Sequence, residues 1–145
     1  MTGSPFAAAA ADAAAADAAT ADGRVEAPYL DGLARGVLRY QRCTACAAVQ
    51  TLARDACAHC GRAALAWHDA SGRAVVHAAT VVGRAPSPAF AALAPYTLVI
   101  AQVEEGARFM GHAEFGVRIG DRVVASFFAW DGQVLVRFLC AGAAA

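Results

Sequence analysis

Two Cys-x-x-Cys pairs constrain this chain more than any other feature. Cys43 and Cys46 form the first pair and Cys57 and Cys60 the second, with ten residues between the pairs. Two residues between paired thiols let a tight turn aim both sulfurs at one point, and two such turns enclose a metal ion in a tetrahedron. The segment is too short to build its own apolar core, so we expect the ion to hold it folded. Because thiolates fill all four positions, the predicted metal is structural rather than catalytic.

Zinc is the metal that this motif favours, with iron and two disulfides as the alternatives. Iron also accepts four thiolates, but an electron-transfer module needs little beyond the cluster, and most of this chain follows it. Disulfides need an oxidising compartment, and the chain lacks the basic start of a secretory signal, since Arg24 is its first basic residue. We therefore expect a structural zinc ion in a cytoplasmic protein. The fifth cysteine, Cys140, lies in an apolar run, and we interpret it as a buried small hydrophobe.

The composition excludes some classes of protein. Of the 145 residues 59% are hydrophobic, but 41 are alanine and 12 of those alanines lie within the first 21 positions. No stretch reaches the roughly 18 consecutive apolar residues of a membrane span, so we expect no membrane association. Twelve basic residues balance twelve acidic ones. A neutral chain gains little from neutralising phosphates, which argues against a general nucleic-acid binder.

The chain divides into three predicted parts. Residues 1–26 are an alanine-rich segment whose evenly spaced aspartates leave no continuous apolar face, and we predict a disordered tail. Residues 27–66 combine a short helix over 27–35, ended by Gly36, with a zinc ribbon whose strands are expected at 37–42 and 49–52. Residues 67–145 are predicted to form a β-barrel.

The third part has alternating, β-branched segments separated by turn residues. Asp131-Gly132 is a strong signal for a two-residue hairpin turn. The strands are expected at 73–83, 96–103, 108–112, 122–130 and 133–139. Five strands without a long helix fit a small barrel, and the OB-fold is the commonest choice. Periodicity alone leaves an SH3-like barrel as the alternative.

The order of these parts resembles a known family, that of small zinc-ribbon/OB-fold proteins which accompany acyl-CoA enzymes, above all thiolases and thiolase-like enzymes. The resemblance covers about residues 27–140. The matching stretches are Leu38-x-Tyr40-Gln41-Arg42-Cys43-x-x-Cys46, Cys57-x-x-Cys60-Gly61, Trp67, Ser71-Gly72-Arg73, Val81-Val82-x-Arg84-Ala85-Pro86, Pro95-Tyr96 and Ile119-Gly120-Asp121-x-Val123. Two positions depart from the family pattern: Ala47 replaces a usual glycine, and Leu52-Ala53-Arg54-Asp55 replaces a Pro-Pro-Arg stretch.

The resemblance implies a mainly β fold with a rubredoxin-like zinc ribbon ahead of a five-stranded OB-fold barrel. It also implies a non-catalytic accessory subunit that docks against a thiolase-like partner in a hetero-oligomer, stabilises that partner, and helps to cover the coenzyme A arm of the substrate.

The residues themselves offer binding groups but no catalytic constellation. The four histidines are scattered, and Cys140 has no identifiable base. Arg73 and Arg84 are candidates to meet a phosphate of coenzyme A, because a guanidinium pairs with phosphate in a bidentate manner. Phe90, in a proline-bearing loop over 84–95, is a candidate partner contact, with packing across the barrel mouth as the alternative.

Single-stranded nucleic-acid binding is the alternative function, because zinc ribbons and OB barrels both serve it elsewhere. It requires a basic strand face with aromatic side chains, and little positive charge accompanies the aromatic residues of the expected strands. Phe127 and Phe128 are adjacent, so in a regular strand they must point to opposite faces.

Overall fold

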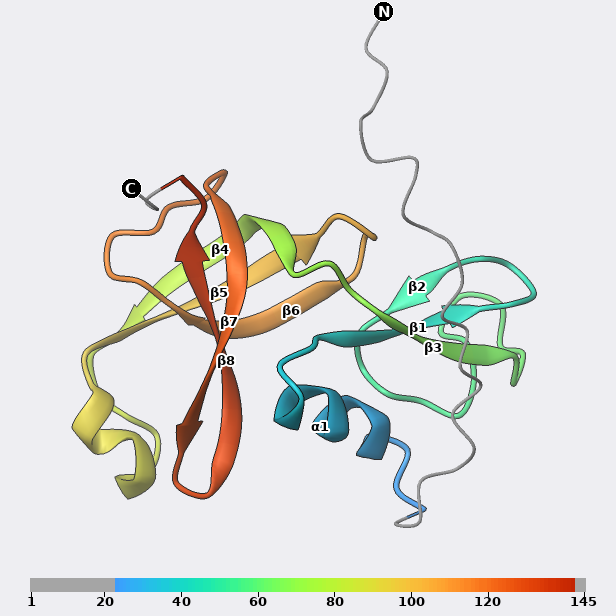
Figure 1. Ribbon diagram of the computed structural model, residues 1–145, viewed down its shortest axis with the longest axis horizontal. Coiled ribbons are helices and arrows are strands. Elements are labelled where there is room, and N and C mark those ends of the chain that lie inside the picture. The colour runs from blue at the N-terminus through green and yellow to red at the C-terminus, as the bar shows by residue number, and fades with distance from the viewer. Residues whose placement is uncertain (1–22, 143–145) are drawn as a thin grey trace, which may run out of the picture.

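The computed structural model describes residues 23–142 (Figure 1). The predicted alanine-rich tail lies almost entirely outside the described residues. In the described part of the chain, no helix is both long enough and apolar enough to cross a membrane.

A short helix and a small sheet come first along the chain. Helix α1 (Ala27–Ala34) has Pro28 in its first turn, as predicted. It leads to a three-stranded antiparallel sheet in the order β2-β1-β3, with β1 (Arg39–Cys43) between β2 (Val49–Gln50) and β3 (Leu65–Asp69). The return strand β2 is shorter than predicted, and β3 was not predicted. Strand β3 pairs with β1 along its whole length, so a partner distant in sequence determines it.

Five further strands close into a barrel. They are β4 (Arg73–Val82), β5 (Tyr96–Val103), β6 (Arg108–Ala113), β7 (Arg122–Trp130) and β8 (Gln133–Cys140). Their order is β4-β5-β6-β8-β7, with β7 pairing back onto β4. Strands β6 and β8 pair in parallel and the other neighbours are antiparallel. This is the strand order of the OB-fold, which confirms the predicted fold class.

One apolar core connects the barrel with the segments before it. Phe109 and Phe138 fill the barrel interior and are among its largest fully buried side chains. Leu33 of α1 and Leu38 belong to the same core cluster, and the ring of Tyr29 stacks on Phe109 with 6.3 Å between centroids. The helix and ribbon are therefore packed onto the barrel.

Two connections of the barrel are well defined. In the β7–β8 hairpin Asp131 and Gly132 have φ of 49° and 75°, which fits the predicted two-residue turn. The predicted loop over 84–95 contains a 3₁₀ helix, η1 (Pro88–Leu93). The indole N–H of Trp130 donates to the carbonyl oxygen of Ala89 at 2.7 Å, which ties this loop to the end of β7.

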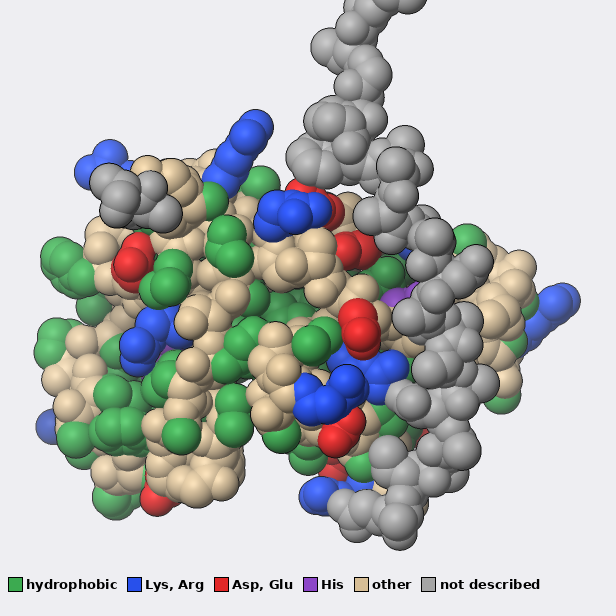
Figure 2. All heavy atoms as spheres, in the orientation of Figure 1, with side chains coloured by type: hydrophobic (Ala, Val, Ile, Leu, Met, Phe, Trp, Pro, Cys, Tyr) green, Lys and Arg blue, Asp and Glu red, His purple; other side chains and the backbone are tan. Residues whose placement is uncertain are grey.

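Charged side chains are unevenly distributed over the face drawn in Figure 2. Side chains of both charges gather beside α1, whereas the hairpin end of the barrel carries mostly hydrophobic and uncharged surface. Phe127 packs against the core, while Phe128 contacts His112 and Arg137 on the outside, so the two phenylalanines point to opposite faces as predicted.

Candidate metal centre and barrel surfaces

The four ribbon cysteines lie on two turns of the same construction. The N–H of Ala47 donates to the carbonyl oxygen of Cys43 at 2.9 Å, and that of Gly61 donates to the carbonyl oxygen of Cys57 at 2.9 Å. The residue after each pair has a positive φ, 64° at Ala47 and 77° at Gly61. Each turn therefore presents its two thiols in the same way, and the β1–β2 and β1–β3 pairings bring the turns together.

The sulfur positions fit a tetrahedral metal. All four Sγ atoms lie within 4.8 Å of one another. The Cys43–Cys60 and Cys46–Cys57 sulfurs are each 3.7 Å apart, and a tetrahedron with Zn–S bonds of about 2.3 Å has edges of about 3.8 Å. All five cysteines are free thiols. The donor set and its spacing therefore fit one ion bound by four thiolates.

The electrostatics of the cluster favour a bound cation. Backbone N–H groups of His59 and Cys60 point at the Cys57 sulfur, at 3.3 and 3.5 Å. These hydrogen bonds, of which the one from the Cys60 N–H has the largest effect, lower the pKa of the Cys57 thiol to about 6. An N–H of Ala48 lowers the pKa of Cys46, but burial and the neighbouring thiols outweigh it and raise that pKa to about 12. The four thiols cannot all ionise together unless a cation compensates their charge.

A glutamine that sequence reasoning missed organises the segment between the cysteine pairs. Gln41 of β1 is buried; its amide donates to the carbonyl oxygen of Arg54 at 3.0 Å and its side-chain oxygen accepts the Arg54 N–H at 3.0 Å. Gln50 donates to the same side-chain oxygen at 2.8 Å. This network fixes the segment that departs from the Pro-Pro-Arg pattern. A polar residue at a buried strand position is the sequence signal that could have indicated it.

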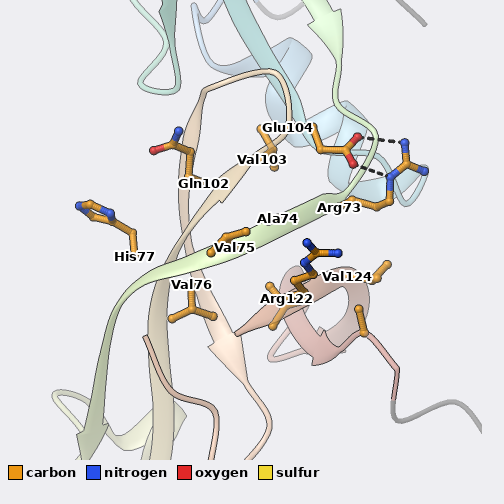
Figure 3. A pocket seen from close by; sticks show the side chains of 12 residues that line it. Arg73, Ala74, Val75, Val76, His77, Gln102, Val103, Glu104, Arg122 and Val124 are labelled. Atoms are coloured by element: carbon orange, nitrogen blue, oxygen red, sulfur yellow. Dashed lines mark hydrogen bonds and ion pairs between the residues drawn. The ribbon is translucent and has the colours of Figure 1, made fainter. Parts of the chain in front are cut away.

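Arg73 lies at the edge of a hollow of about 660 Å³ at the start of β4 (Figure 3). Its guanidinium makes two contacts with the Glu104 carboxylate, at 2.8 and 2.9 Å, and this hydrogen bonding holds the pKa of Glu104 below its usual value. His77 and Gln102 lie at the other end of the hollow (Figure 3). Arg73 is thus already paired with a carboxylate, and its proposed contact with coenzyme A stays a prediction.

The other two predicted contact residues lie at the far end of β4. Arg84 is exposed and follows shortly after the last residue of that strand, so the structure does not bring it together with Arg73. Phe90 of η1 packs its ring near Tyr96 and His112, with centroid distances of 6.4 and 6.2 Å. Packing against the barrel therefore accounts for Phe90, and a partner contact at this residue stays a prediction.

Comparison with protein families identifies both halves of the described chain. Residues 30–66 match the ChsH2 rubredoxin-like zinc ribbon domain, and residues 67–128 match the ChsH2 C-terminal OB-fold domain. The two matches lie end to end and together span most of the chain. The chain belongs to the ChsH2 family. A search of curated proteins gave no match.

Two solved structures resemble this ChsH2-family chain. A chain of the structure described as "Ltp2-ChsH2(DUF35) aldolase" is 26% identical with a TM-score of 0.71, and the match covers 83% of this chain and 98% of that one. A DUF35-family protein of unknown function from Sulfolobus solfataricus is 16% identical with a TM-score of 0.62, covering 82% of this chain and 87% of that one. The second likeness supports the fold alone.

Ala47, which replaces the glycine usual in the family, has a left-handed backbone conformation that is expected to lower the stability of the first cysteine turn. A left-handed conformation costs a residue with a Cβ about 1–2 kcal/mol, which glycine avoids. Glycine also loses more conformational entropy on folding, which offsets about 0.5–1 kcal/mol of that gain. We expect Ala47→Gly to raise the free energy of unfolding by about 0.5–1 kcal/mol, measured by urea unfolding at saturating zinc. Gly61→Ala is the matched control and should lower it by a similar amount. No change in either variant would contradict the prediction.

Proposed function

We propose that the chain is a non-catalytic accessory subunit that holds one structural zinc ion and associates with a thiolase-like enzyme acting on acyl-CoA thioesters. One observation carries the accessory-subunit part of the proposal, whereas the thiolase-like and acyl-CoA parts rest on the resemblance of the sequence motifs. The structural match covers 98% of the length of a chain in the structure described as "Ltp2-ChsH2(DUF35) aldolase". The order of ribbon, barrel and family motifs extends this likeness over most of the sequence.

The zinc ion is proposed from the four clustered thiols. Cys43, Cys46, Cys57 and Cys60 would hold it, and when bound it would cross-link the two cysteine turns. Four thiolates leave no position for a substrate. The role of these residues is therefore to stabilise the ribbon that packs on the barrel.

The fifth cysteine, Cys140, is not activated as a nucleophile. The Cys140 backbone N–H donates to a Glu114 carboxylate oxygen at 2.9 Å. Burial, followed by the Glu114 carboxylate, raises the pKa of the Cys140 thiol. A thiol with a raised pKa is a poor nucleophile.

The β6–β7 loop is the surface best suited to a protein partner. Phe115 is 91% exposed and Ile119 69% exposed, although the loop is held firmly. The Gly120 N–H donates to the Val76 carbonyl oxygen at 2.8 Å, and the Arg118 N–H donates to an Asp121 carboxylate oxygen at 2.8 Å. An exposed aromatic on a rigid loop loses little entropy on binding. We propose that Phe115 enters an apolar socket on the enzyme subunit.

Co-purification tests the proposal. The tagged chain, expressed in its native host, should capture a thiolase-like enzyme and increase its activity toward an acyl-CoA. Phe115→Ser should weaken the association by on the order of tenfold, because buried aromatic anchors dominate interface energies. Leu52→Ser is the matched control, since Leu52 is 70% exposed but lies on the ribbon. Turnover of an acyl-CoA by the isolated chain, or capture of no such enzyme, would overturn the proposal.

A further inference from the structure

An apolar groove of about 710 Å³ lies between helix α1 and the barrel. Leu98 of β5 and Met110 of β6 line the groove, as do residues of η1 and of the β7–β8 hairpin. Helix α1, which lies beside that hairpin in Figure 1, contributes Leu30 and Leu33. Strands β5 and β6 are the second and third strands of the barrel, and this face with its flanking loops is where OB-folds bind ligands. The volume falls within the range of about 300–1,000 Å³ typical of small-molecule sites.

The lining is uncharged. None of the residues lining the groove, all within 23–142, is a lysine, arginine, aspartate or glutamate. His112 borders it, and burial, followed by the charge of Arg137, lowers the pKa of this imidazole below its usual value. Burial raises the pKa of Tyr29. At neutral pH the groove therefore presents no charge to a phosphate, which disfavours a nucleic acid in it.

The loop that contains η1 forms one wall of the groove through Phe90. The ring of Phe90 rests on Tyr96 and His112, and Trp130 ties the same loop to β7. Large hydrophobic side chains stay uncovered beside it: Met110 is 69% exposed and Leu30 42% exposed. Removing such surface from water is favourable, and a flexible methionine adapts to ligands of varied shape.

We propose that this groove binds the hydrocarbon part of an acyl thioester. The inference rests on the proposed function, because it assigns part of the partner's substrate to this chain. A hydrocarbon chain fits a small trough that is apolar, uncharged and bounded by a helix, a loop and a hairpin. The proposed protein-docking loop with Phe115 is not part of the groove lining. Tyr96 and His112 line both the groove and the hollow beside Phe115, so an enzyme subunit docked at this loop would lie next to the groove.

The two methionines of the sequence provide a direct test, because one of them lines the groove and the other is Met1. The full chain is labelled with ¹³C-methyl methionine and titrated with N-acetylcysteamine thioesters of four-, six- and eight-carbon acids, which carry an acyl tail but no nucleotide. The Met110 signal should move saturably and the Met1 signal should not. Affinity should rise about fourfold for each added CH₂ that becomes buried.

Two variants locate the binding. Leu30→Glu places a charge in the groove at an exposed helix position and should lower the affinity at least tenfold, whereas Leu52→Glu on the ribbon should leave it unchanged. A Met110 signal that does not move, or an affinity independent of chain length, would overturn the inference. If the signal responded only to the co-purified enzyme, the groove would be a protein interface, and the inference would fail while the proposed function stood. If the chain bound the thioesters but captured no enzyme, the groove would be supported as a hydrocarbon site and the proposed function would fail.

Discussion

Replacing Cys57 with serine should abolish zinc binding and unfold the ribbon. Cys57 is 3% exposed. Its sulfur accepts hydrogen bonds from two backbone N–H groups, which would stabilise the negative charge of a metal-bound thiolate. A serine hydroxyl is a poor zinc ligand, and structural zinc contributes about 10–16 kcal/mol of apparent binding free energy in small zinc domains. We expect the zinc content to fall from one per chain to none and the free energy of unfolding to fall by more than about 4 kcal/mol.

The control for this substitution is Cys140→Ser. Cys140 lies on β8, outside the sulfur cluster, so this variant should keep one zinc per chain and melt close to the parent protein. Elemental analysis of untagged protein and thermal melting measure both quantities. If the Cys57 variant kept its zinc and its melting temperature, the proposed site would be wrong. A visible absorption band in the parent protein would instead identify iron.

The effect of losing the metal should extend beyond the ribbon. Leu38, which directly precedes β1, and Tyr40 within β1 are almost fully buried and belong to the same core cluster as Phe109 of the barrel. Unfolding the ribbon would withdraw both side chains from that core. The barrel of the Cys57 variant should therefore also be less stable than the barrel of the parent protein, which links the metal site to the surfaces proposed to bind partner and substrate.

Local patterns were sufficient to predict much of the barrel. The alternation of apolar residues placed β5 and β7 correctly, and Asp131-Gly132 fixed the turn into β8. The pattern failed for β3, whose residues Leu65–Asp69 show no alternation in burial and form a strand because they pair with β1. The 3₁₀ helix η1 was missed because three prolines in one segment favour an irregular loop.

Of the candidate sites, too, the sequence could predict only the one that depends on local spacing. The cysteine cluster was foreseeable because the spacing within each pair is local. The groove was not, since α1 and the strands that line it are separated by the whole ribbon. Nor could the sequence indicate that Glu104, in the turn after β5, would engage Arg73, or that Phe90 would pack on His112. Such contacts depend on the registers in which β4, β5 and β6 pair.

Gly111 is the barrel position at which a single added methyl group should be most costly. A Cβ built at Gly111 would lie 2.6 Å from a methyl carbon of Val136 and 2.9 Å from the ring of Phe138. Val136 and Phe138 are 5% and 0% exposed, respectively, so neither has space to move away. Overpacking of this kind costs about 1–3 kcal/mol. We expect Gly111→Ala to lower the free energy of unfolding by about 2–3 kcal/mol in urea unfolding at saturating zinc.

Gly83→Ala is the matched control, because nothing lies within 4 Å of the Cβ it would add, and it should be nearly neutral. The double variant Gly111→Ala, Val136→Ala tests the cause. Removing the valine methyl that the new Cβ would strike should make the combined loss smaller than the sum of the two single losses, by about 0.5–3 kcal/mol. Strict additivity would mean that the cost arises elsewhere than at this contact, and that close packing of β6 on β8 does not require glycine.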